Sequence, residues 1–335
     1  MRLFSRAAAA AFASVALSVA AFSVAAFSAS GPAQAQAWPA RPVRVIVAAA
    51  PGVPSDLLAR GAVEPLGKAL GQPIIVENRI GADGIIGTEA CARAAPDGYA
   101  LCGTASNVIV WNTVLRKDLP YDALKDLVPV MHGAFFDSAL LVHPSVPARS
   151  VQQLIELAKG NPDKVNWGHF GVNSTGYMYE EWLKRSRQAP FYAVAYKTQP
   201  QVLQALLVNE SNVAVYGLTN IENQVKGGKL RALAVTSSRR VEWMPDVPTF
   251  EEEGIKLPLR TWFGYHYPAA TSRELVVRMN AELRKTMEAP SFRTGVMDRF
   301  GLIAATGTPE DFDAYIRNQI KQVAELVNYI GLKAE

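Results

Sequence analysis

The sequence predicts an α/β protein built on largely parallel sheets. From residue 38 onward, short apolar runs rich in β-branched residues alternate with stretches that have the spacing of an amphipathic helix. Such alternation is typical of strand–helix–strand units, in which helices cover the faces of a sheet. The chain has 335 residues, of which 49% are apolar and 19% charged, so it has enough apolar material for one large core or two ordinary ones.

The composition excludes several classes of protein. The formal net charge is +4, which is too small for a protein that relies on neutralising a run of phosphates, so we expect no nucleic-acid partner. The apolar content excludes disorder as a general description of the chain. Two cysteines cannot build a disulfide framework or a cysteine-rich zinc module.

The first 37 residues have the layout of a cleaved secretory signal. Arg2 and Arg6 precede an alanine-rich apolar run over 7–27, and two overlapping Ala-x-Ala sites end at Ala35 and Ala37. A transmembrane anchor is the alternative, because the run approaches the length of a membrane span. Alanine inserts weakly and the small residues follow where cleavage requires them. We therefore expect a signal peptide over 1–37 and an exported mature protein.

The first block of predicted elements begins with a buried strand, Val43–Val47. Residues 51–52 turn the chain, and Ser55 and Asp56 are expected to cap a helix that ends at Gly71. The elements predicted after this helix are a strand over 74–76, a loop with Gly81, Gly84 and Gly87, a helix over 88–94, a turn over 96–98 and a strand over 101–103.

A second block begins near Phe136 and repeats this alternation, although no residue-level repeat is present. Ser150 and Gln153 form a capping box, which predicts that a helix begins there. The predicted strands cover 139–142, 165–167, 191–195, 213–216 and 230–235, and the predicted helices cover 150–159, 176–187, 201–207 and a further stretch before 230.

The last part of the chain is predicted to return to the first block. Three prolines and an acidic run over 239–258 indicate a connection that crosses between the blocks. The elements predicted after it are a strand over 262–267 and helices over 273–288, 291–300 and 309–328. Helices with so few strands cannot form a sheet of their own. We therefore expect them to pack on the first block and to make the first domain discontinuous.

The sequence contains no recognised motif for a catalytic nucleophile, a dinucleotide site or a catalytic metal. Ser174 has Val172 where the first glycine of a G-x-S-x-G elbow should stand. The run that begins at Gly81 lacks the tight G-x-G of dinucleotide sites, so we interpret its glycines as required by backbone turns and close packing. The histidines, none of which has metal-ligand spacing, are His132, His143, His169 and His266. We expect no catalytic residue, no metal and no cofactor.

The two cysteines, Cys91 and Cys102, allow two interpretations. In an oxidising compartment they could pair, because a helix residue and a residue of the following strand can approach each other. Spacing alone does not determine the separation of their Cα atoms. We therefore favour two small, buried, apolar side chains without a disulfide.

Three strand-to-helix loops, over 51–55, 103–107 and 171–176, carry small and hydroxyl residues. The start of a helix presents unpaired N–H groups and a positive dipole end, which suit an anion such as a carboxylate. Ordinary helix capping is the alternative explanation. Three such loops in an exported chain without catalytic machinery predict a carboxylate-binding cleft. The polar side chains expected in it are those of Ser55, Thr104, Ser106, Asn173, Ser174 and Thr175.

Six segments of the mature chain carry a resemblance to a known family. They are 38–44, 71–79, 92–99, 119–122, 228–236 and 245–249. Together they resemble the periplasmic solute-binding proteins of tripartite tricarboxylate transporters, which are also called Bug or TctC-like proteins. The resemblance covers essentially the whole mature chain. It implies a type II periplasmic binding protein fold, with two α/β lobes and a ligand cleft between them.

The resemblance also implies domains, function and partners. Lobe 1 is expected over 38–135 plus 245–335, and lobe 2 over 136–244. We expect a periplasmic, monomeric protein that captures a small organic carboxylate and delivers it to integral membrane subunits of a transporter, without catalysis. One alternative is a sensor subunit that presents its ligand to a signalling receptor. The other is a hydrolase or lyase that acts on a carboxylated substrate. The sequence leaves the identity of the carboxylate open.

The resemblance assigns the ligand to the same three loops. The residues expected to bind it are Ala49, Pro51, Gly52, Ser55, Thr104, Ser106, Gly171, Asn173, Ser174 and Thr175. This chain departs from the family pattern at Ala49, where an aromatic residue is usual, and at Val53 and Pro54, of which the latter has no N–H donor. The further departures, which we expect to set selectivity, are His169, Phe170, Tyr177 and Gly217.

Overall fold

The computed structural model describes residues 38–172, 174–257 and 260–333. The predicted signal peptide therefore lies outside the described residues. From Arg41 onward the described chain forms one compact unit. Within this described part, no helix is both long and apolar enough to cross a membrane.

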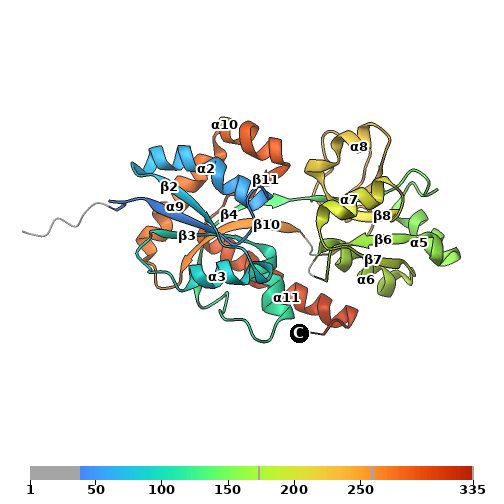
Figure 1. Cartoon of the computed structure of the whole chain (residues 1–335), viewed down its shortest axis with the longest axis horizontal. Helices are drawn as coiled ribbons and strands as arrows, with labels where there is room; N and C mark the ends of the chain where they lie inside the picture. Colours follow the sequence, from blue (N-terminus) through green and yellow to red (C-terminus); the bar gives the residue numbers. More distant parts are fainter. Residues whose placement is uncertain (1–37, 173, 258–259, 334–335) are drawn as a thin grey trace, which may run out of the picture. The chain divides into compact units, whose positions relative to one another are not determined.

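The first of two sheets has six strands in the order β11-β4-β10-β3-β1-β2 (Figure 1). Strand β1 is parallel to β2 and β3, whereas β10 is antiparallel to β3 and β4, and β11 is antiparallel to β4. The strands are β1 (Val43–Val47), β2 (Ile74–Asn78), β3 (Ala100–Ala105), β4 (Leu127–Phe136), β10 (Thr261–Pro268) and β11 (Leu302–Ala304).

The second sheet has five strands in the order β7-β6-β8-β5-β9. Strand β6 is parallel to β7 and β8, whereas β5 is antiparallel to β8 and β9. The strands are β5 (Ser138–Val142), β6 (Asn166–His169), β7 (Tyr192–Ala195), β8 (Val213–Gly217) and β9 (Arg231–Val235).

Both sheets are mixed, so the expectation of largely parallel sheets is wrong for the strands next to the crossings. Strand β4 leads the chain out of the first sheet, and a single residue, Asp137, separates it from β5 in the second sheet. Strand β10 leads the chain back into the first sheet. Because an outgoing strand and a returning strand run in opposite directions, β4 and β10 pair antiparallel.

The helices near the first sheet include those that end the chain. Helices α9 and α11 pack on β4, and α2 packs on β2 and on α9, which confirms that the last helices return to the first block. The helices of this block are α2 (Pro54–Leu70), α3 (Ile85–Ala92), α4 (Asn112–Leu115), α9 (Arg273–Glu288), α10 (Pro290–Phe292) and α11 (Pro309–Ile330). The predicted division into 38–135 plus 245–335 and 136–244 stays a prediction.

The predicted helix signals at Ser150 and Gly71 are confirmed, whereas the caps predicted at Ser55 and Asp56 are wrong. Ser150 accepts a hydrogen bond from Gln153 N, as predicted. Helix α2 instead has Val53 at its N-cap and Pro54 as its first residue, so the expected caps Ser55 and Asp56 lie inside its first turn. The helices of the second block are α5 (Val151–Gly160), α6 (Thr175–Arg187), α7 (Gln199–Leu207) and α8 (Glu222–Lys226).

Strands β4 and β11 are absent from the sequence-based prediction. Pro129 and Gly133 interrupt the apolar pattern of β4, and both residue types are rare inside strands. Strand β11 has only three residues. The helix predicted over 291–300 forms only as the short α10, followed by irregular helical turns over Arg293–Met297 and Asp298–Phe300.

Cys91 and Cys102 form a disulfide, with their Cα atoms 5.8 Å apart. The prediction of two unpaired apolar side chains is therefore wrong. Helix α3 packs on β3, and this contact brings a helix residue beside a residue of the next strand. Both cysteines are buried. The sequence spacing of 11 permits this approach but does not require it.

Candidate functional site

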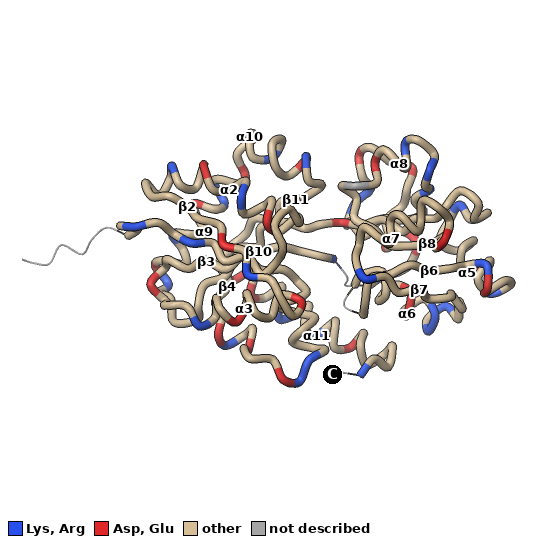
Figure 2. Tube along the Cα trace, viewed as in Figure 1, with Lys and Arg blue, Asp and Glu red and all other residues tan. Residues whose placement is uncertain are grey.

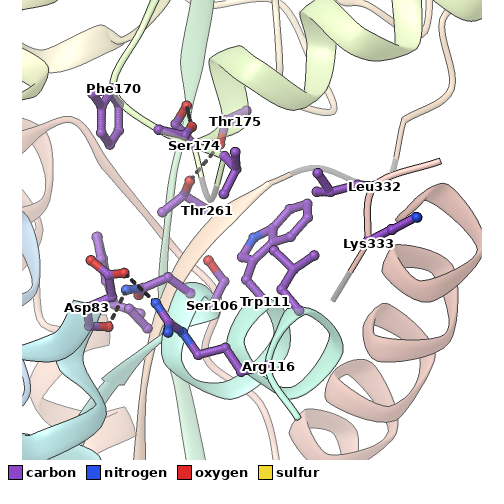
Figure 3. A pocket seen from close by; sticks show the side chains of 16 residues that line it. Asp83, Ser106, Trp111, Arg116, Phe170, Ser174, Thr175, Thr261, Leu332 and Lys333 are labelled. Atoms are coloured by element: carbon purple, nitrogen blue, oxygen red, sulfur yellow. Dashed lines mark hydrogen bonds and ion pairs between the residues drawn. The ribbon is translucent and has the colours of Figure 1, made fainter. Parts of the chain in front are cut away.

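Two neighbouring cavities lie where the three predicted loops meet. The larger has a volume of about 470 Å³ and the smaller about 120 Å³. Ala105, Asn107 and Phe263 line both, so the cavities adjoin. Figure 3 shows the larger cavity, whose walls come from the ends of β3 and β6, the start of α6, the start of β10 and the segment that follows α11.

The first loop contributes to the smaller cavity through Ala49 and Ser55, whereas Pro51 and Gly52 belong to neither lining. Gly52 has a φ of +83°, a conformation that glycine adopts without strain. Its N–H donates to Asp56 Oδ2 at 2.8 Å. The N–H of Gly52, a residue that we expected to bind the ligand, is therefore already engaged within the loop.

Asp56 is a buried carboxylate beneath this loop. Besides the Gly52 N–H, it accepts hydrogen bonds from Arg60 Nε and Asn78 Nδ2. Burial by itself raises the pKa of Asp56, but the hydrogen bonds from Arg60, Gly52 and Asn78 outweigh it and hold the pKa below its ordinary value. The first loop is thus held in place by a buried anion that is fully hydrogen-bonded.

The second loop supplies Thr104 to the smaller cavity and Ser106 to the larger one. Thr104 Oγ1 donates to Gly264 O at 3.1 Å and lies 2.8 Å from His266 Nδ1. Burial lowers the pKa of His266 to about 3, so the ring is neutral, and its Nδ1 either donates to Thr104 Oγ1 or accepts from it. The only hydroxyl proton of Thr104 is therefore used inside the protein. Ser106 Oγ is 3.5 Å from Trp262 N.

The third loop places Gly171, Ser174 and Thr175 in the wall of the larger cavity. Ser174 is the N-cap of α6: its Oγ accepts from Tyr177 N at 3.3 Å and donates to Gly171 O at 2.6 Å. Thr175 Oγ1 is 3.4 Å from Thr261 Oγ1, which joins the start of α6 to the start of β10. The predicted ligand residue Asn173 lies outside the described residues.

Of the four residues expected to set selectivity, the structure places one in the wall of a cavity and three outside both walls. Phe170 lines the larger cavity, whereas His169, Tyr177 and Gly217 line neither cavity. The His169 ring is 5.0 Å from that of Tyr177, and its Nδ1 accepts from Gly171 N at 3.2 Å. Burial lowers the pKa of His169, which favours the neutral ring that this hydrogen bond requires. His169 therefore holds the third loop through Gly171 without lining either cavity.

Gly217 is explained by packing. A Cβ atom at this position would lie 2.4 Å from the Phe136 ring, so a larger residue would require that ring to move. The ring of Phe136 thus occupies the space that a larger residue would need. An influence of Gly217 on selectivity stays a prediction.

The glycine-rich loop before α3 adds a residue that the sequence analysis missed. A Cβ atom at Gly84 would lie 2.8 Å from Ala48 O, and one at Gly87 would lie 2.7 Å from Ala48 Cα. The interpretation that these glycines serve turns and close packing is therefore confirmed. This packing also brings Asp83 into the wall of the larger cavity, where it forms an ion pair with Arg116 at 3.1 Å.

Ala105, Asn107 and Val172 lie inside two of the predicted loops, and the other residues of the larger cavity come from segments that are distant in sequence. No local motif marks them, because only the tertiary fold brings them together. Those that the sequence analysis did not identify are Asp83, Ala105, Asn107, Trp111, Leu115, Arg116, Val172, Thr261, Phe263, Leu332 and Lys333. In the described part of the chain, no group of three or more His, Cys, Asp or Glu side chains is placed to hold a metal ion.

Comparison with known proteins agrees with this geometry. The sequence profile of the tripartite tricarboxylate transporter family receptor matches residues 58–332. Protein BugT of Bordetella pertussis is 30% identical over 309 residues, which cover 91% of this chain and 94% of BugT. The profile match includes the second and third loops and begins after the first loop.

Solved structures extend the comparison to the fold. The periplasmic binding protein BugD is 28% identical and has a TM-score of 0.74, with coverage of 89% of this chain and 100% of BugD. Rpa4515 of R. palustris, solved with adipate, is 26% identical and also has a TM-score of 0.74, with coverage of 88% and 98%. The predicted type II periplasmic binding protein fold is therefore confirmed.

Proposed function

This chain belongs to the tripartite tricarboxylate transporter receptor family, and we propose that it captures a small organic carboxylate and delivers it to membrane subunits of such a transporter. Members of this family are periplasmic solute-binding proteins. The adipate bound to Rpa4515 supports a carboxylate as the class of ligand. A periplasmic location, reached through a cleaved signal peptide over 1–37, is part of the proposal.

The observation that carries the proposal is the meeting of the three loops at two adjoining cavities. The smaller cavity lies at the start of α2, where Pro54 and Ser55 form part of its lining. The positive end of this 17-residue helix favours an anion there. The Asp56 carboxylate adds little opposing charge, because it is paired with Arg60. We place the ligand carboxylate in the smaller cavity and the rest of the ligand in the larger one.

The proposed contacts come from residues that line the cavities. Ser55 and Ser106 supply hydroxyls, and Ala49 and Gly171 allow the backbone to approach the ligand closely. Thr175 connects the ligand to α6, and Ser174, whose hydroxyl donates to Gly171 O, holds the third loop against the cavity. Pro51, Gly52 and Thr104 hold the loops in shape, since the donors of Gly52 and Thr104 are engaged within the protein.

Capture is proposed to work through contacts with both sheets. Ser106 and Trp111 follow β3 of the first sheet, whereas Gly171 and Thr175 follow β6 of the second, and all four line the larger cavity. A ligand that touches both sides stabilises the arrangement in which the sides are close. A membrane subunit could then distinguish the loaded protein from the empty one.

Thermal unfolding of the purified protein without residues 1–37 tests ligand binding. A ligand present at about 100 times its dissociation constant stabilises the folded state by about 2.7 kcal/mol, which shifts the melting temperature measurably. The screen should contain mono-, di- and tricarboxylates with matched amides as controls. If no acid stabilises the protein, or if amides stabilise it equally, carboxylate capture is wrong.

Two further measurements test delivery and export. Cells that lack the protein should lose uptake of the identified acid and regain it when the gene is restored. Sequencing the N-terminus of the exported protein should show cleavage near Ala37. Recovery of the acid chemically unchanged after long incubation is expected of a binding protein, whereas product formation would favour a hydrolase or lyase.

A further inference from the structure

Arg116 is a guanidinium in the wall of the larger cavity that has unused hydrogen-bonding capacity. It follows α4 directly, and its Nη2 is 3.1 Å from Asp83 Oδ2. Its Nε is buried, and no hydrogen-bond partner for it is present among the described residues. Figure 3 shows the side chain extending from its helix toward Asp83. A ligand in the cavity does not reach the buried Nε, but a second carboxylate can replace Asp83 as the partner of Nη2 and accept a charge-assisted hydrogen bond from it.

The carboxylate of Asp83 is a weakly held partner of Arg116. The side chain of Asp83 is 59% exposed, and exposed ion pairs contribute little free energy. Its backbone has a φ of +53°, which a turn between Gly81 and Gly84 imposes, and Asn107 Nδ2 donates to its carbonyl oxygen at 3.3 Å. The position of Asp83 is thus determined by the turn, whereas its bond to Arg116 is exchangeable.

Aromatic side chains lie in the wall of the larger cavity beside polar ones such as Ser106, Asn107 and Thr261. Trp111 and Phe263 line the larger cavity from the side of the first sheet, and Phe170 lines it from the side of the second. The charged residues of the lining are Asp83, Arg116 and Lys333. In Figure 3 the ammonium group of Lys333 points away from the other labelled side chains, which leaves Arg116 as the cation for a ligand.

We propose that Arg116 determines specificity by binding a second acid group, so that the preferred ligand is a dicarboxylate with an apolar chain or ring between its acids. In the protein without ligand, the Asp83 carboxylate occupies the position on Arg116 that the second acid group of the ligand takes when it binds. The inference rests on the proposed function, because it requires the first carboxylate to lie in the smaller cavity. The apolar body then lies among Trp111, Phe170 and Phe263.

Matched acids and matched variants test this proposal. The probes are two pairs that share a carbon skeleton: hexanoate with adipate, and benzoate with benzene-1,4-dicarboxylate. Titration calorimetry gives the ratio of diacid to monoacid affinity for each pair. Arg116→Gln should lower this ratio by about 10- to 100-fold, because a hydrogen bond between charged groups is lost. Asp83→Asn should raise it severalfold, because the competing carboxylate is removed while Asn still tolerates a positive φ.

The control is Arg317→Gln, which removes an exposed arginine that also pairs with an aspartate, Asp313, at 2.7 Å. It should leave both affinities unchanged. If Arg116→Gln weakens each diacid and its monoacid by the same factor, or weakens neither, the role of Arg116 is wrong. A lower ratio of diacid to monoacid affinity in Asp83→Asn would show that Asp83 does not compete with the second acid group. This test holds even if Arg116→Gln fails to fold. If the unaltered protein binds other acids of the thermal screen but none of these four, the proposal for Arg116 is wrong, whereas failure of every acid in that screen would overturn the proposed function.

Discussion

Arg260 and Asp137 form a two-point ion pair in which Nε lies 2.8 Å from Oδ1 and Nη2 lies 2.8 Å from Oδ2. Asp137 is the residue between β4 and β5, and Arg260 directly precedes β10. The pair therefore joins the segment that leaves the first sheet to the segment that returns to it. Asp137 is fully buried, and the Arg260 guanidinium also stacks 3.6 Å from the centre of the Phe135 ring.

Breaking this pair from one side should destabilise the protein strongly. Asp137→Asn leaves the largely buried guanidinium of Arg260 without a counter-charge, and such a loss costs about 3 kcal/mol or more. The free energy of unfolding in urea measures the effect. Asp313→Asn is the control, because its partner Arg317 is exposed and the expected loss is below about 1 kcal/mol. Equal losses in the two variants would contradict the structural role of the crossing pair.

Removing the disulfide should lower stability. The bond between Cys91 and Cys102 closes a loop with a sequence separation of 11, and the loss of loop entropy in the unfolded chain corresponds to about 3 kcal/mol. Replacing both cysteines with alanine should therefore lower the free energy of unfolding in urea by about 3 kcal/mol. Reducing the unaltered protein should lower it by the same amount. A reductant should have no effect on the double variant. If the reductant lowers the free energy of unfolding of the unaltered protein and of the double variant equally, loss of the disulfide is not the cause of the lower stability.

Glu180 on α6 should make stability depend on pH. Burial raises the pKa of its carboxyl to about 7, and Lys184 Nζ, 3.0 Å from Oε1, offsets only part of this effect. An unfolded glutamate titrates near 4.5. Between these values the folded protein retains a proton that the unfolded chain releases. The free energy of unfolding should thus fall as pH rises from about 4.5 to about 7, and this contribution should be level outside that window.

The variant Glu180→Gln removes this titration. Relative to the unaltered protein, it should be more stable by about 3 kcal/mol at pH 8 and of equal stability at pH 4. Urea unfolding across pH 4–8 measures the difference. Glu181→Gln is the matched control, since Glu181 also pairs with Lys184 but is less buried. A constant difference between Glu180→Gln and the unaltered protein across this range would show that Glu180 does not titrate there.

A comparison of two serines that cap helices distinguishes a structural contribution from a contribution to ligand binding. Ser174 and Ser150 each cap a helix and accept a backbone hydrogen bond from the residue three positions later. Replacing either serine with alanine should reduce the free energy of unfolding by about 1 kcal/mol. Only Ser174→Ala should also weaken carboxylate binding severalfold, because Ser174 lines the larger cavity and Ser150 does not. Calorimetry with adipate measures this, and unchanged affinity in Ser174→Ala would argue against the third loop.

Local sequence determined most of the secondary structure. A Ser150–Gln153 capping box, an apolar run over Val43–Val47 and a glycine after Leu70 act through neighbouring residues, so their effects can be read without the fold. Strand β4 escaped prediction because its pairing with β10, rather than its composition, stabilises it. The mixed direction of both sheets follows from the crossings, which no local pattern encodes.

For the site, the sequence by itself predicted the three loops and a carboxylate as the class of ligand, because small residues, hydroxyls and helix starts lie next to one another along the chain. Only the tertiary structure decided which of their donors remain for a ligand. It engaged the Gly52 amide with Asp56 and the Thr104 hydroxyl with Gly264. It also brought Asp83 and Arg116, 33 positions apart, into one cavity wall. Hydrogen-bond partners and charges distant in sequence meet only when the chain is folded, and these decide what a site can bind.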